Sequence, residues 1–69
     1  MTMAPVTILR EAKGRQLVHV GAGWEPAGAG LRQTDGYYAV RWWVDGGQYG
    51  RRFRDLDEAM AYWEKAVKR

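Results

Sequence analysis

The sequence predicts a small α+β domain in which an antiparallel sheet of three to four strands packs on one C-terminal helix. Three observations lead to this fold class. Two segments rich in β-branched and aromatic residues are each divided by a glycine-containing turn, as in β-hairpins. A glycine-rich segment separates these two hairpins, and residues from 56 onward repeat their apolar side chains at helical spacing. At 69 residues, the chain is expected to form a single domain, 1–69, with room for one small core.

The first expected hairpin covers about residues 6 to 20. Its two halves, VTILREA and QLVHV, are apolar or β-branched and flank the turn signal Lys13-Gly14-Arg15. Residues 21–36 follow with five glycines and Pro26, and they show neither a strand nor a helix period. We therefore expect 21–36 to be a glycine-rich loop.

The second expected hairpin is the strongest strand signal in the chain. Residues 37–44 alternate with the period of a strand, so that neighbouring side chains face opposite sides of the sheet. Gly46-Gly47 is expected to form the two-residue turn, because glycine adopts positive φ without steric strain. Residues 48–54 then return antiparallel. Counting outward from that turn places Val40 opposite Phe53 and Arg41 opposite Arg52.

A C-terminal helix is expected over residues 56–68. Asp55 can accept a hydrogen bond from an orphan N–H at the helix start, and Glu58 three residues later completes a capping-box pattern. The apolar stripe of this helix consists of Leu56, Ala59, Met60, Trp63, Ala66 and Val67. Such a stripe needs a sheet face to cover it.

The hairpin register divides its side chains between two faces. One face is expected to be the core that meets the helix, and it carries Val40, Trp42, Val44, Tyr49 and Phe53. The other is expected to face solvent and is the candidate binding surface, with Tyr37, Arg41, Trp43, Arg52 and Arg54. Like charges directly opposite each other are destabilising, so the expected Arg41–Arg52 pair calls for a bound anion or for nearby acids.

The charge of the chain is concentrated in the same hairpin. Net charge is +3, and residues 37–54 alone contribute four arginines against Asp45, so the remainder sums to zero. A local excess of arginine favours anionic partners. The chain contains no cysteine and one histidine, His19, so we expect no disulfide, metal or cofactor site and no enzymatic activity. Without a secretory h-region or a long apolar run, a cytoplasmic protein with no membrane partner is expected.

Residues 36–68 resemble a known type of DNA-binding domain. The pattern is an aromatic strand, the turn residues Asp45-Gly46, a basic return strand ending at Phe53, and a capped helix that begins with Asp55. It resembles the three-stranded-sheet-plus-helix domains at the N-termini of phage and transposon tyrosine integrases and in plant ethylene-response factors. Those domains place the sheet face in the major groove of DNA. The resemblance implies a DNA-contacting role for Arg41, Trp43, Arg52 and Arg54, and a source in a phage or mobile element.

Two functions remain open from the sequence. The first is a sheet-face DNA-binding module, in which Trp43 stacks while the arginines contact phosphates or base edges. The second is a small protein-binding module, of the kind by which a phage protein binds or inhibits a host protein. Exposed aromatic residues among arginines also characterise interface hot spots, and an acidic protein surface would satisfy the same arginines. A free edge strand could in addition pair with a second copy to form a homodimer.

Overall fold

The computed structural model describes residues 2–68 and confirms the α+β fold with one C-terminal helix. The elements are β1 (Val6–Ala12), β2 (Arg15–Val20), β3 (Gly23–Ala27), β4 (Gly30–Thr34), β5 (Tyr37–Val44), β6 (Gly47–Phe53) and α1 (Leu56–Val67). No helix within residues 2–68 has the length and apolar character needed to span a membrane.

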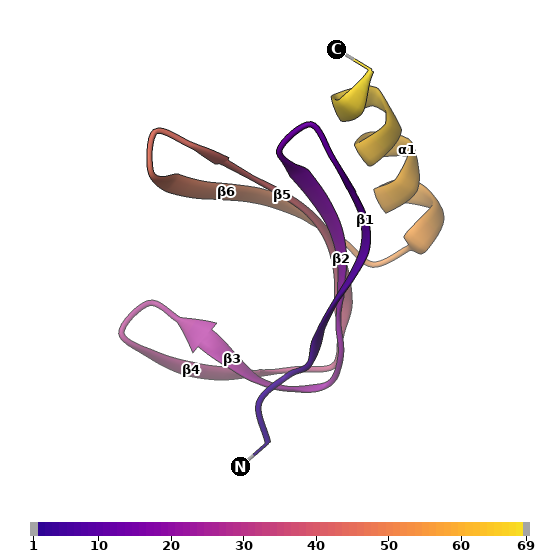
Figure 1. Ribbon diagram of the computed structural model, residues 1–69. Helices are drawn as coiled ribbons and strands as arrows, with labels where there is room; N and C mark the ends of the chain where they lie inside the picture. The colour runs from indigo at the N-terminus through magenta and orange to yellow at the C-terminus, as the bar shows by residue number, and fades with distance from the viewer. Residues whose placement is uncertain (1, 69) are drawn as a thin grey trace.

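The strands form two sheets. The larger sheet has the order β1-β2-β5-β6, and β3 and β4 form a separate two-stranded sheet inserted between β2 and β5; all of these pairings are antiparallel. The β3–β4 hairpin and the β5–β6 hairpin both project to the side away from α1, so the molecule has an open C shape in profile (Figure 1). We call the β3–β4 hairpin the arm. The inner face is the face of the larger sheet opposite α1, carrying Tyr37, Ala39, Arg41 and Trp43 on β5 with Gln48, Gly50 and Arg52 on β6.

The second hairpin turns one residue earlier than its glycine pair predicts. Its central residues are Asp45 and Gly46, at φ values of 50° and 79°, and Val44 pairs with Gly47. Positive φ at both central positions defines the type I′ turn, for which Asp-Gly is a preferred pair. The expected Gly46-Gly47 turn is therefore wrong, and Arg41 lies opposite Gly50 instead of Arg52. Because each partner moves by two positions along β6, every side chain keeps its expected face.

Residues 21–36, expected to be a loop, instead form the arm. The many glycines of this segment obscure its strand periodicity. The turn of the hairpin contains Gly28 at φ 60°, and its strands pair Glu25 with Arg32. The N-terminal segment ties the arm to the rest of the chain. The Ala4 N–H donates to the Trp24 carbonyl at 2.7 Å, and the Trp24 N–H donates to the Thr2 carbonyl at 2.9 Å. These hydrogen bonds satisfy backbone N–H and C=O groups that would lack a protein partner if the segment were an irregular loop.

The main core lies between α1 and the larger sheet, while Val18 and Val20 are buried on the inner-face side of β2. Leu17, Val40 and Ala59 are fully buried and contact one another across β2, β5 and α1. Half-buried side chains surround them: Leu9, Tyr38, Trp42, Phe53, Met60, Tyr62 and Trp63. As expected, Asp55 caps the helix, because its Oδ1 accepts the Asp57 N–H at 3.0 Å.

Leu56, expected in the buried stripe of the helix, is 36% exposed at the start of α1, and two hairpin residues expected in the core also lie outside it. Val44 is 49% exposed and Tyr49 is 54% exposed. They occupy the helix-facing side of β5 and β6, but close to the hairpin tip. The 8 residues of β5 span about 27 Å, whereas the 12 residues of α1 span about 18 Å, so the helix cannot cover the whole strand. The tip of the β5–β6 hairpin therefore extends beyond the helix into solvent (Figure 1).

Candidate functional site

The inner face brings together four of the five predicted site residues: Tyr37, Arg41, Trp43 and Arg52. Tyr37 and Arg52 are in contact, with the guanidinium of Arg52 lying 4.6 Å from the centroid of the Tyr37 ring. The guanidinium of Arg41 lies 5.4 Å from the ring centroid of Trp43, which is 46% exposed near the hairpin tip. Arg54 lies after the end of β6 and is exposed, and within residues 2–68 it forms no ion pair. Cation–π contacts hold the guanidiniums in defined positions.

A buried carboxylate on the arm organises this face. Glu25 is 7% exposed, and its Oε1 accepts hydrogen bonds from Nε and Nη2 of Arg32 at 3.0 and 2.9 Å. The same oxygen lies 3.3 Å from Nη2 of Arg52, and Oε2 accepts the Tyr37 hydroxyl at 2.8 Å. A buried carboxylate is stable only when it is paired and hydrogen-bonded, and Glu25 meets both conditions. The cluster therefore joins the arm to the larger sheet through polar contacts.

Tyr37 stays protonated over the physiological pH range. Its pKa is raised from 10.0 to about 12, first because burial disfavours the phenolate and then because its hydroxyl donates to the carboxylate of Glu25, whose negative charge adds to the effect. The nearby Arg32 and Arg41 oppose this shift. Tyr37 thus acts as a hydrogen-bond donor that fixes Glu25, and its ring is the platform on which Arg52 lies.

Arg41 is positioned by a second polar chain, which runs across the sheet. Its Nε donates to Oε1 of Gln16 on β2 at 2.8 Å, and the amide nitrogen of Gln16 donates to the carboxylate of Glu11 on β1. Within residues 2–68 the other guanidinium nitrogens of Arg41 have no hydrogen-bond partner and can reach solvent or a ligand. The inner face and the arm together carry three arginines, Arg32, Arg41 and Arg52. Two carboxylates oppose them: Glu25, which is directly paired, and the more distant Glu11. Positive charge is therefore in excess there.

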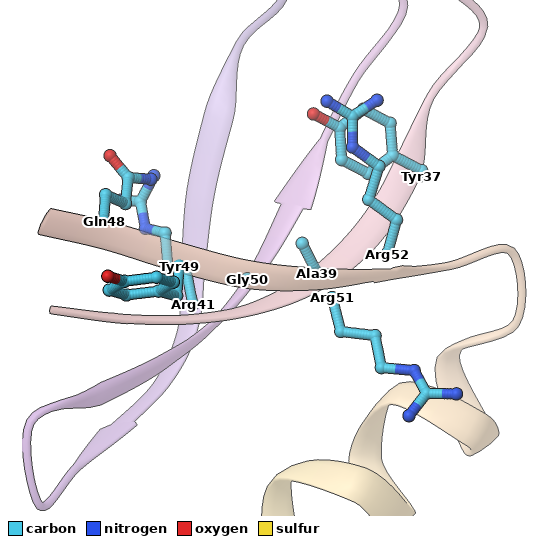
Figure 2. Close-up of a pocket in the computed structure, with 8 residues that line it drawn as sticks. All are labelled: Tyr37, Ala39, Arg41, Gln48, Tyr49, Gly50, Arg51 and Arg52. Atoms are coloured by element: carbon cyan, nitrogen blue, oxygen red, sulfur yellow. The ribbon is translucent and has the colours of Figure 1, made fainter. Parts of the chain in front are cut away.

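A shallow groove of about 380 Å³ runs along the β5–β6 part of the inner face. Its lining includes Tyr37, Arg41, Gln48, Arg51 and Arg52. Figure 2 shows Arg52 beside Tyr37 and Gln48 beside Arg41 on one side of the hairpin, while Arg51 points to the other side, toward α1. There the guanidinium of Arg51 lies 5.4 Å from the Tyr62 ring centroid. Arg51 and Arg52 are thus sequence neighbours with opposite surroundings.

Comparison with known proteins gives no relative for this chain. No family model matches it. No curated protein and no solved structure matches it either. Across the part of the chain that the structure describes, no group of three His, Cys, Asp or Glu residues is arranged to hold a metal ion.

Sequence reasoning missed three residues of this site: Gln16, Glu25 and Arg32. Asp45 and Asp55 are the acids nearest in sequence to the arginines of the second hairpin, yet the carboxylate that pairs with Arg52 is Glu25. One signal for it was present. Glu25 and Arg32 stand at equal distances from the turn residues Gly28-Ala29, as an opposite-charge cross-strand pair would.

Proposed function

We propose that this protein is a small DNA-binding module that contacts DNA through its inner face. The observation that carries the proposal is the excess of guanidinium groups over carboxylates on one concave surface, where Arg41 and Arg52 line a shared groove. Guanidiniums bind phosphates through paired N–H donors, and cation–π contacts with Trp43 and Tyr37 orient Arg41 and Arg52 before any ligand arrives. Trp43 is exposed enough to stack on a base or sugar.

The resemblance of residues 36–68 to integrase N-terminal and ethylene-response-factor domains supports the same proposal, because those domains also use the sheet face opposite the helix. It further suggests a protein of a phage or mobile element, and the lack of a secretory h-region in the sequence favours a cytoplasmic one. Binding without catalysis fits the chemistry of the face. Tyr37, whose pKa is raised to about 12, is not a proton acceptor at neutral pH.

A salt-dependent binding assay tests the proposal. Fluorescence anisotropy with labelled DNA is expected to show binding at about 50 mM salt that weakens steeply toward about 200 mM, because phosphate contacts release counterions. Arg41→Ala should weaken binding and reduce the slope of log affinity against log salt by about one. Arg51→Ala is the matched control, since it removes the same charge from the helix side. Equal effects of the two substitutions, or binding insensitive to salt, would contradict the proposal.

The hairpin tip favours a second candidate function, protein binding. Trp43 on the inner face and Val44 and Tyr49 on the opposite face are each about half exposed there, and exposed apolar residues at one end of a fold often mark a protein interface. An acidic partner surface would complement the neighbouring arginines, and the free edges of β1 and β6 could pair with a second copy. A pull-down from nuclease-treated host lysate distinguishes the two functions. A single protein retained by the wild type and lost with Tyr49→Ser would favour the protein partner.

A further inference from the structure

The arm carries an arginine that belongs with the inner face. Arg32 lies on β4, outside the larger sheet, yet its Nη2 and the Nη2 of Arg52 approach the same carboxylate oxygen, Oε1 of Glu25, at 2.9 and 3.3 Å. The two guanidiniums are therefore neighbours, although they come from different hairpins. Two like charges this close are unfavourable unless enough negative charge surrounds them.

Glu25 alone cannot neutralise or saturate this pair. Its two oxygens already accept from Nε and Nη2 of Arg32 and from the Tyr37 hydroxyl, in addition to the ion pair with Arg52. Each guanidinium has five N–H donors, so both arginines keep donors that Glu25 does not reach. The side chains of Arg32 and Arg52 are 47% and 54% exposed, whereas that of Glu25 is only 9% exposed. The carboxylate thus holds the pair from beneath while the free donors lie on the solvent side.

We propose that Arg32 and Arg52 together bind a phosphate group, which completes the neutralisation that Glu25 begins. A phosphate offers several charged oxygens to two guanidinium forks at once. If DNA binds as proposed above, the phosphate belongs to the DNA backbone, and the DNA strand lies between the arm and the β5–β6 hairpin. Arg41 lines the same groove as Arg52 and can bind a neighbouring phosphate. Arginines spread over two hairpins match a polymer that repeats its charge at every unit. Only the source of the phosphate rests on the proposed function.

Two measurements on the full chain test this site. In the first, the side-chain Nε–H signals of the arginines are followed by NMR during titration with inorganic phosphate; those of Arg32 and Arg52 should shift, and that of Arg51 should not. In the second, DNA binding is measured for Arg32→Ala, Arg32→Lys and the control Arg51→Ala. Arg32→Ala should weaken binding about fivefold to tenfold and lower the salt slope by about one, with less than about a twofold effect for Arg51→Ala. Arg32→Lys keeps the charge but not the paired N–H donors of the guanidinium, so its DNA affinity should lie between those of Arg32→Ala and the wild type.

The outcomes separate this site from the proposed function. If Arg32→Ala binds DNA as the wild type does while Arg41→Ala is weakened, the Arg32 site is wrong and DNA binding stands. If the wild type fails to bind DNA but phosphate shifts the Arg32 and Arg52 signals, the site stands with free phosphate as its ligand and DNA binding is wrong. The absence of both responses overturns both. A poly-glutamate peptide that shifts the same signals at lower concentration than DNA identifies a carboxylate partner and overturns the phosphate assignment. If Arg32→Ala does not fold, the DNA affinity of Arg32→Lys and the phosphate titration of the wild type still test the site.

Discussion

Replacing Glu25 with glutamine should destabilise the protein because this carboxylate pairs directly with both Arg32 and Arg52. Removing one partner of a fully buried ion pair costs about 3–5 kcal/mol. Here the two arginines are half exposed, and water screens part of the repulsion that remains. We therefore expect a loss of about 2 kcal/mol, within the range of hydrogen bonds to charged groups. For a domain of this size, that loss lowers Tm by roughly 8–16 °C.

The same substitution should change the titration of Tyr37. In the wild type its pKa is raised from 10.0 to about 12, with Glu25 among the causes. The native state therefore holds this proton more tightly than the unfolded state does. The resulting stabilisation is fully present below pH 10 and is lost as the pH rises to about 12. With glutamine at position 25, burial remains but the negative charge is gone, so the pKa of Tyr37 should fall toward 10.0.

Thermal unfolding followed by circular dichroism measures the first effect, and the near-ultraviolet absorbance of tyrosinate measures the second. Tyr37→Phe assigns the late-titrating tyrosine among the four in the chain. Glu64→Gln, on the exposed side of α1, is the matched control and should change stability by less than about 0.5 kcal/mol. The reasoning is refuted if Glu25→Gln has the same Tm as the control and its highest tyrosine pKa stays near the wild-type value.

Three further predictions follow from the fold. Gly23→Ala should lose about 2–3 kcal/mol, because its Cβ would lie 2.8 Å from the Ala4 backbone nitrogen at φ 148°, whereas Gly30→Ala has open space and should melt like the wild type. Leu17→Ala should lose about 2–5 kcal/mol in chemical denaturation by emptying the buried core, and an unchanged midpoint would contradict that core. Trp43→Ala should leave thermal stability within about 1 kcal/mol of wild type but weaken DNA binding about tenfold, since one stacked base contributes about 1–3 kcal/mol; unaltered affinity would remove Trp43 from the interface.

The sequence was most informative where one structural period ran without interruption. Strand alternation over 37–44 and helical spacing from residue 56 predicted β5 and α1, and they assigned Val40 and Trp63 to the core side. The turn of the second hairpin was misplaced because Gly46-Gly47 and Asp45-Gly46 both satisfy a two-residue turn. Only the backbone shows that Asp45 takes the positive φ. Face assignment survived that error because side chains alternate with a period of two.

Exposure at the hairpin tip and the identity of the anion depend on lengths and long-range contacts that local patterns do not contain. Val44 and Tyr49 alternate correctly, but whether they are covered depends on how far α1 reaches along β5. Glu25 belongs to a segment whose glycines obscure strand periodicity, and its contacts with Tyr37 and Arg52 join residues far apart in sequence. Tertiary contacts of this kind override what a local window indicates.

The attachment of the arm has a consequence for how the protein opens. The arm is linked to the larger sheet by the Glu25 cluster and by the two backbone hydrogen bonds between Trp24 and the segment that precedes β1, and the core residues Leu17, Val40 and Ala59 lie outside it. Elements with few buried apolar contacts open as separate cooperative units at lower free energy than the whole fold. Amide hydrogens of β3 and β4 should therefore exchange with solvent well before those of β2 and β5. Such an arm can open and close again while the rest of the protein stays folded.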